Sequence, residues 1–224
     1  MLSPMQSSVL LIFAMFTHAA LAQSLLAGYL GAYSATNGTF IGAVARTLGF
    51  QGILNLDEKG DRSDYLAAIG FTNATNEGDA VLLQILSPIN PSVPWVAIVL
   101  GVAGDCESMP IPNGDAPWAA QLVPSDGSPL GPLPLPGDTR STLIGGYNAL
   151  TVFCGEPMAF VIQSNSGRNI LAPVWTDQEG TRHPMIIVHD ITTGRVAVSP
   201  SLASYHAAAT SPVTIEEVFF AFFT

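Results

Sequence analysis

Positive charge is scarce in this sequence. Seven lysine and arginine residues stand against 17 aspartate and glutamate residues, which gives a formal net charge of −10 at pH 7. Nucleic-acid binding depends on cationic contacts with phosphates, so this composition argues against a nucleic-acid-binding protein. Attraction to anionic lipid is disfavoured for the same reason.

Long hydrophobic runs are also missing, because no apolar segment reaches the roughly 20 residues that cross a bilayer. The run from Val9 to Leu21 is shorter, and it leads into the small residues Ala20 and Ala22 at the −3 and −1 positions before Gln23. This layout is typical of a secretory signal peptide. We expect residues 1–22 to be removed and residues 23–224 to form one secreted β-rich domain with no membrane segment.

Cysteine is limited to Cys106 and Cys154. An isolated pair in an exported protein usually bonds, and this disulfide would stabilise the fold by roughly 4 kcal/mol on the chain-entropy estimate. The alternative is a thiol nucleophile at Cys154. Asn37 and Asn73 begin N-glycosylation sequons, so we expect at least one of them to carry a glycan.

Short β-branched and aromatic segments, separated by Gly, Pro, Asn and Asp, make up most of the chain. This pattern predicts an all-β fold, either an antiparallel β-sandwich or alternatively a barrel. Asn37-Gly38 lies between two apolar runs and predicts a hairpin turn. Ser199 before Pro200 predicts an N-cap and one short helix near the C-terminus, over Ser199 to Thr210.

Proline is concentrated in the middle of the chain, where residues 88–136 carry 11 of the 17 prolines. Proline lacks the amide hydrogen that a central strand needs, so a proline-rich surface loop is predicted from about residue 104 to about residue 140. The alternative is a linker between two domains. The predicted bond between Cys106 and Cys154 favours a loop inserted within one domain.

Two histidines, His183 and His189, lie close together in the sequence. Along an extended strand six residues separate two backbones by roughly 20 Å, which is too far for one metal ion to bind both imidazoles. Asp190 neighbours His189 and would point to the opposite face, so it cannot orient that ring. We therefore expect two ordinary strand-end histidines and no metal site.

Signatures of catalysis are few. The sequence contains no G-x-S-x-G motif and no glycine-rich phosphate loop, so we expect no cofactor. The carboxylate pairs Asp105/Glu107 and Asp177/Glu179 have a spacing that exposed turns produce as readily as a glycosidase site does. Enzymatic activity is left open, and a non-enzymatic protein is favoured.

Trp118 lies in the proline-rich segment beside Asn113 and Asp115. A tryptophan on a loop could stack on a sugar ring while the two polar side chains bind its hydroxyl groups. The alternative is that Trp118 folds back and seals the core of the domain. Trp95 and Trp175 lie in apolar segments and are expected in the core.

The segments GYLGAYSATNGTFIGAVA and ILAPVWTDQEGTRHPMIIVHDITTGRVAVSP resemble a group of small secreted proteins of mushroom-forming fungi. The shared features are a hairpin near the start, a strand ending in tryptophan, an acidic-Gly turn, another strand and a short helix. Here Trp175, Glu179-Gly180 and the segment Ser199 to Thr210 take those places. The resemblance implies a fungal extracellular protein with one β-rich domain, and it carries no activity.

These observations favour a secreted, glycosylated, non-enzymatic protein that binds cell-wall polysaccharide through Trp118, Asn113 and Asp115. One alternative is an extracellular hydrolase that cleaves polysaccharide with two carboxylates. Another is a protease-inhibitor or host-interaction module that uses the proline-rich loop.

Overall fold

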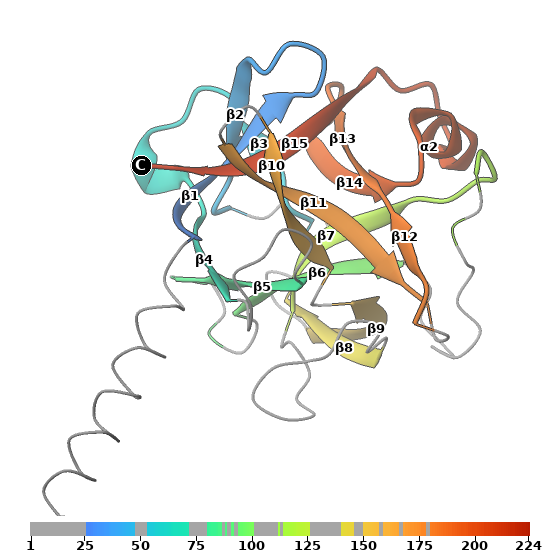
Figure 1. Cartoon of the computed structure of the whole chain (residues 1–224), viewed down its shortest axis with the longest axis horizontal. Helices are drawn as coiled ribbons and strands as arrows, with labels where there is room; N and C mark the ends of the chain where they lie inside the picture. Colours follow the sequence, from blue (N-terminus) through green and yellow to red (C-terminus); the bar gives the residue numbers. More distant parts are fainter. Residues whose placement is uncertain are drawn as a thin grey trace, which may run out of the picture.

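The structure is a computed structural model of the whole chain. It describes residues 26–47, 53–71, 80–86, 88, 91, 94–100, 112, 114–125, 140–145, 150–156, 159–165, 168–177 and 180–224. Within these ranges the chain forms a 15-stranded antiparallel sheet system, one α-helix and one short 3-10 helix (Figure 1). No helix within them is long and apolar enough to cross a membrane.

The strands are β1 (Leu26–Ser34), β2 (Phe40–Val44), β3 (Leu56–Asp57), β4 (Ala67–Phe71), β5 (Ala80–Ile85), β6 (Trp95–Leu100), β7 (Ala120–Ser125), β8 (Arg140–Gly145), β9 (Leu150–Glu156), β10 (Phe160–Asn165), β11 (Arg168–Thr176), β12 (Arg182–Pro184), β13 (Ile186–Asp190), β14 (Arg195–Ser199) and β15 (Ile215–Phe223). The 3-10 helix η2 spans Arg62–Asp64, and the helix α2 spans Leu202–Ala208.

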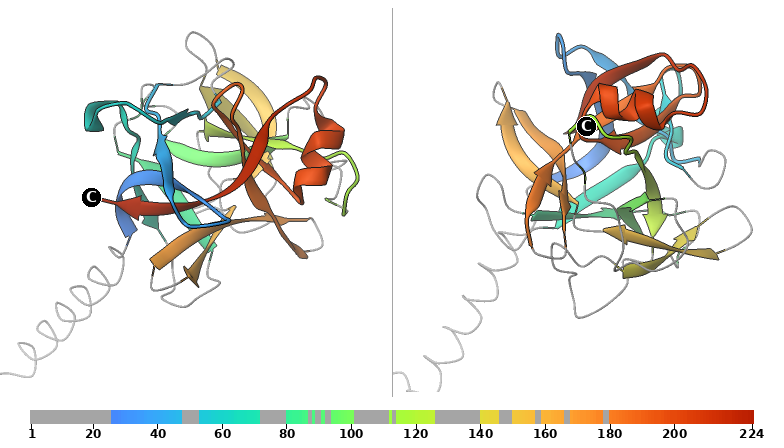
Figure 2. Two further views of the ribbon diagram at one scale, coloured as in Figure 1. Left: turned by 90° about the horizontal axis from the view of Figure 1, so that it is seen from above. Right: turned by 90° about the vertical axis from the view of Figure 1, so that its right-hand side faces the viewer.

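Eight strands close into an antiparallel barrel in the order β1–β15–β13–β14–β7–β6–β5–β4 and back to β1. The hairpin β10–β11 pairs with β5 and with β15, which are not neighbours in this ring. Helix α2 lies outside the barrel beside β14 and β15 (Figure 2). The all-β fold with one short helix near the C-terminus is confirmed, and of the two predicted architectures the strand pairing is that of the barrel.

The barrel is closed by the pairing of β1 with β15. Tyr29 lies opposite Phe223, and the antiparallel register continues unbroken to Ser34 opposite Val218. Successive residues of a strand point to opposite faces. Leu30 is accordingly fully buried, whereas its neighbour Tyr29 is partly exposed on the outer face.

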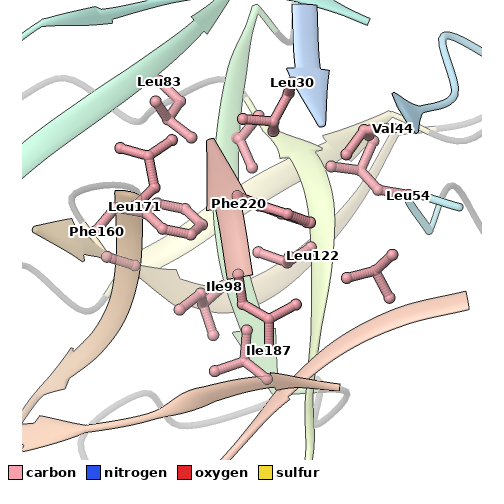
Figure 3. Packing of buried hydrophobic residues seen from close by; sticks show 14 of the residues in the cluster. Leu30, Val44, Leu54, Leu83, Ile98, Leu122, Phe160, Leu171, Ile187 and Phe220 are labelled. Atoms are coloured by element: carbon pink, nitrogen blue, oxygen red, sulfur yellow. The ribbon is translucent and has the colours of Figure 1, made fainter. Parts of the chain in front are cut away.

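The interior of the barrel is packed with hydrophobic side chains. Phe160 and Phe220 are the largest fully buried residues, and Leu122 and Ile187 pack with them (Figure 3). An eight-stranded barrel has an interior just wide enough for side chains to fill. The barrel centre is therefore the hydrophobic core of the protein.

Strand β7 lies within the segment that was predicted to be a proline-rich loop, so that part of the prediction is wrong. Val96 of β6 lies opposite Pro124 of β7, which shows that the proline occupies a regular strand position. Proline is tolerated in a strand where its nitrogen need not donate a ladder hydrogen bond. The outward residue Val123 is also buried, because Ile53 covers it in a small second cluster. Residues 126–139 of the predicted loop lie outside the described residues.

The predicted hairpin and helix both form, with shifted ends. The β1–β2 connection consists of residues 35–39, and Gly38 takes a left-handed φ of 71° in it, so the loop is longer than the two-residue turn expected. The N-cap of α2 is Ser201, whose side chain accepts a hydrogen bond from the Ser204 amide, and not Ser199. Ser199 instead donates to the Trp118 carbonyl, 2.8 Å away, and is fully buried.

Adjacent phenylalanines in β15 provide a test of the inward–outward alternation. Phe220 is fully buried in the barrel, whereas Phe219 is partly exposed and stacks on Tyr33. We expect Phe220→Ala to lower the free energy of unfolding by about 3–5 kcal/mol, because it leaves a cavity in the core. Phe219→Ala should cost about 1 kcal/mol, the size of a surface aromatic pair. Urea unfolding of the two variants measures both values, and equal losses would contradict the assignment of faces.

Candidate functional site

Trp118 does not offer an exposed ring, which corrects the prediction that it stacks on a sugar. Its side chain is 4% exposed and packs edge-on against Trp175, with ring centroids 5.6 Å apart. Its carbonyl accepts hydrogen bonds from Ser199 and Ser204. The alternative interpretation holds: Trp118 folds back and belongs to the core.

The two polar residues predicted beside Trp118 have different outcomes. Asp115 is exposed, and its carboxylate accepts a hydrogen bond from the Ser201 hydroxyl at 2.9 Å, next to the start of α2. Asn113 lies outside the described residues. Because the Trp118 ring is buried, it cannot stack on a sugar beside Asp115, as the predicted site required.

Each strand histidine has a carboxylate partner of its own. His183 Nε2 lies 2.9 Å from Asp177 Oδ2, and His189 Nδ1 lies 3.0 Å from Glu216 Oε1. His189 is 1% exposed, so it is more deeply buried than an ordinary strand-end residue. Glu216 faces it across the β13–β15 pairing, a relation that the sequence order could not show. The described residues contain no group of three or more His, Cys, Asp or Glu that could hold a metal ion.

The predicted modification sites lie partly outside the described residues. Asn37 is exposed in the β1–β2 loop, where its side-chain oxygen accepts hydrogen bonds from the Thr39 amide and hydroxyl. Asn73 and Cys106 lie outside the described residues. The backbone of Cys154 belongs to β9. Glycosylation and the disulfide therefore stay predictions.

Six partly exposed aromatic residues cluster on the outer surface where β1, β2 and β15 meet. We call this cluster the aromatic face. Adjacent ring centroids lie 5.3 to 6.1 Å apart, within the range of edge-to-face and stacked contacts. The members are Tyr29, Tyr33, Phe40, Tyr65, Phe219 and Phe223.

The strand register and one glycine explain why these rings meet. Tyr29 lies opposite Phe223 in the β1–β15 pairing. A Cβ atom at Gly31 would lie 2.9 Å from the Phe223 ring and 3.1 Å from the Phe40 ring. The missing side chain of Gly31 therefore lets both rings pack over the backbone of β1.

The exposure of the aromatic face distinguishes it from the core. Phe40 is 47% exposed, although it is a large apolar residue. The guanidinium carbon of Arg168 lies 5.0 Å from the centre of the Tyr33 ring, a cation–π geometry at the edge of the cluster. Contiguous exposed apolar surface of this kind marks interaction sites on proteins.

A pocket of about 320 Å³ lies outside the barrel, between α2 and the turn that joins β13 to β14. Its polar lining combines a carboxylate, a guanidinium, a phenol, an amide and several hydroxyl groups. These belong to Gln121, Asp190, Thr192, Thr193, Arg195, Tyr205, Thr210 and Ser211.

Hydrogen bonds hold the Asp190 side chain in the wall of this pocket. It is 4% exposed, and it accepts hydrogen bonds from the Thr192 amide at 2.9 Å and the Thr193 hydroxyl at 2.8 Å. Arg195 lies opposite it in the β13–β14 pairing. The β13–β14 turn therefore places the acidic residue Asp190 and the basic residue Arg195 directly opposite each other on neighbouring strands.

The Tyr205 phenol responds electrostatically to both charges. Its partial burial raises its pKa above the usual 10.0, the negative charge of Asp190 raises the pKa further, and Arg195 lowers it. Burial is the largest of these causes because an ionised phenolate loses solvation in the pocket. Tyr205 therefore stays a neutral hydrogen-bonding group throughout the physiological range.

The fold and these two surfaces define an all-β barrel protein with an outer aromatic face and a polar pocket beside its helix. Comparison with protein-family models, with curated proteins and with solved structures finds no match to this chain.

The raised pKa of Tyr205 predicts a contribution to alkaline unfolding. Because the folded-state pKa lies above the unfolded value, the stabilisation from the neutral phenol is complete below about pH 10 and is lost as the pH rises through the folded-state pKa. We expect Tyr205→Phe, which cannot ionise, to lose less stability than the unchanged protein between about pH 8 and about pH 11. Urea unfolding across this range measures the difference. Tyr29→Phe, which removes a hydroxyl group outside the pocket, is the control, and identical pH profiles for Tyr205→Phe and the unchanged protein would contradict the prediction.

Proposed function

We propose that this is a secreted, glycosylated, non-enzymatic protein that binds polysaccharide through the aromatic face. The observation that carries the proposal is the continuous cluster of six partly exposed rings, with Phe40 47% exposed at its surface. Because Trp118 is buried, the binding surface lies instead on the outer side of β1, β2 and β15.

The chemistry of the aromatic face suits sugar rings. A pyranose ring presents apolar C–H groups on its faces and hydroxyl groups around its rim. Phenylalanine rings such as Phe40 and Phe223 offer apolar packing surface. Tyrosines combine an apolar ring with a hydroxyl group that donates and accepts hydrogen bonds, so Tyr29 and Tyr33 can meet both parts of a sugar.

Charge favours a neutral polysaccharide. The chain carries a formal net charge of −10, so its overall field repels anionic polymers. Glu217 is exposed on β15 beside Val218, at the Ser34 end of the β1–β15 pairing. Neutral wall polymers such as glucans and chitin pay no such electrostatic cost, and they are the polysaccharides we propose as ligands.

Sequence features support an extracellular setting. The segment up to Ala22 has the layout of a signal peptide, and the Asn37 sequon falls on an exposed loop where a glycan would have room. Polysaccharide is abundant outside cells and in their walls. Binding there requires no cofactor.

The hydrolase alternative calls for two cooperating carboxylates, generally about 5 to 9.5 Å apart. Among the described residues that line the pocket, Asp190 is the single carboxylate. Asp177, from one of the predicted pairs, is 8% exposed and lies against His183. Neither observation favours hydrolysis over binding. The binding experiment therefore also detects hydrolysis, through reducing ends released into the supernatant.

Phe40→Ala should weaken sedimentation with insoluble glucan or chitin. Loss of one exposed ring contact is worth about 1.4 kcal/mol, which corresponds to about a tenfold weaker association. The measurement is the bound fraction at increasing amounts of polysaccharide, for the purified full chain and the variant. Circular dichroism of the variant checks that the barrel is intact.

Leu86→Ala is the matched control, because Leu86 is 48% exposed, as Phe40 is, but lies outside the aromatic face. It should bind like the unchanged protein. Equal binding by the Phe40→Ala and Leu86→Ala variants would refute the role of the aromatic face. Release of reducing ends into the supernatant would favour the hydrolase instead.

A further inference from the structure

The pocket beside α2 is a second site, separate from the aromatic face. None of its lining residues belongs to the aromatic cluster. Its walls come from β7, from the β13–β14 turn, and from α2 with the segment that follows it. Segments distant in the sequence therefore build one concave surface.

Small side chains leave the space of this pocket open. Ala119 and Ala197 line it from the side of the barrel, and Ala208 and Ala209 line it from the end of α2. Protein interiors are otherwise packed to crystal-like density, with few voids larger than a water molecule. A pocket of about 320 Å³ lies at the small end of the range for ligand sites and suits one compact molecule.

The charges of the pocket favour a ligand without net charge. Asp190 and Arg195 are directly opposite each other in the β13–β14 register and carry opposite charges. Asp190 is also held in place by the backbone amide of Thr192 and the hydroxyl of Thr193. An ionic ligand would meet one charge of its own sign wherever it bound beside this pair.

The remaining polar groups match hydroxyl groups. The Tyr205 phenol and the Thr192 hydroxyl each donate and accept hydrogen bonds, and the Gln121 amide does both with separate atoms. The hydroxyl groups of a ligand have the same dual character. Val213 supplies apolar surface for the carbon skeleton of such a ligand.

We propose that this pocket binds one small neutral polyhydroxylated molecule, of the size and chemistry of a single sugar residue. The residue could be a free monosaccharide or the end of a polysaccharide chain, and both present the same hydroxyl groups. Asp190, Arg195 and Tyr205 form the polar wall that binds it, and the small residues of α2 set its size limit. Binding in the pocket does not depend on the aromatic face.

The test uses saturation-transfer NMR on the purified full chain, with glucose, mannose and N-acetylglucosamine as probes of the free sugar. Cellotetraose and chitotetraose are the probes of a chain end. Binding of a monosaccharide, or of a tetrasaccharide alone by the Phe40→Ala variant, supports the site and identifies the source of the residue. Absence of binding by all five probes at millimolar concentration overturns the proposal.

Ala208→Phe tests whether the probes bind in the pocket, because the added ring would occupy the pocket volume from the end of α2. It should abolish binding of the monosaccharides that bind the unchanged protein, and binding of the tetrasaccharides when it is combined with Phe40→Ala, because glucan and chitin fragments can also bind the aromatic face. Ala207→Phe is the matched control, since Ala207 is exposed on the same helix and does not line the pocket. Unchanged binding of a monosaccharide by Ala208→Phe, or of a tetrasaccharide by Ala208→Phe combined with Phe40→Ala, overturns the proposal.

Tyr205→Phe keeps the test decisive if Ala208→Phe does not fold. It removes one hydroxyl group and keeps the ring, so it should weaken binding about tenfold, the value of a single hydrogen bond. Binding as tight as in the unchanged protein contradicts the role of Tyr205 in the polar wall and overturns the proposal. Phe40→Ala should leave monosaccharide binding intact, which separates this site from polysaccharide binding at the aromatic face.

Discussion

The pairing of β1 with β15 is the constraint on which both faces of the barrel depend. Its register runs from Tyr29 opposite Phe223 to Ser34 opposite Val218. This register determines which of the paired side chains point into the barrel and which point outward. The inward set contributes Phe220 to the core, and the outward set contributes most of the aromatic face. A slip of one residue would exchange the two sets, because the side-chain period of a strand is two. Stability and surface chemistry are thus fixed by the same hydrogen-bond ladder.

Local patterns in the sequence were enough to predict the class of the fold and many of its elements. Turn residues between short β-branched and aromatic segments indicated many short strands, and Asn37-Gly38 located the first hairpin. The choice between sandwich and barrel depends on pairings between distant strands, which periodicity does not contain. β7 was missed because Pro124 suggested a loop, although the strand is held from both sides by β6 and β14. Tertiary packing overrode the local preference there.

The two candidate surfaces were largely hidden in the sequence for the same reason. Tyr29 and Tyr33 alternate visibly in the first strand, but their partners Phe219 and Phe223 lie at the other end of the chain. Trp118 was predicted to be available for binding because Asn113 and Asp115 lie near it in the sequence, whereas its ring contacts Trp175 in the core. The pocket unites four segments that are separate in the sequence, and residues 208–213 are the longest continuous stretch of its lining. Glu216, the carboxylate partner of His189, was equally out of reach of sequence reasoning, because it lies on β15.

The position of β1 and β15 at opposite ends of the barrel sequence has a consequence for biogenesis. β1 is synthesised long before β15, so the edge of β1 that pairs with β15 stays unpaired while the rest of the protein is made. An unpaired edge that carries Tyr29 and Tyr33 is a template for association with other nascent chains. A glycan attached at Asn37, in the loop directly after β1, would shield that edge during the interval. A glycan on this loop would then act while the protein folds rather than in the folded barrel.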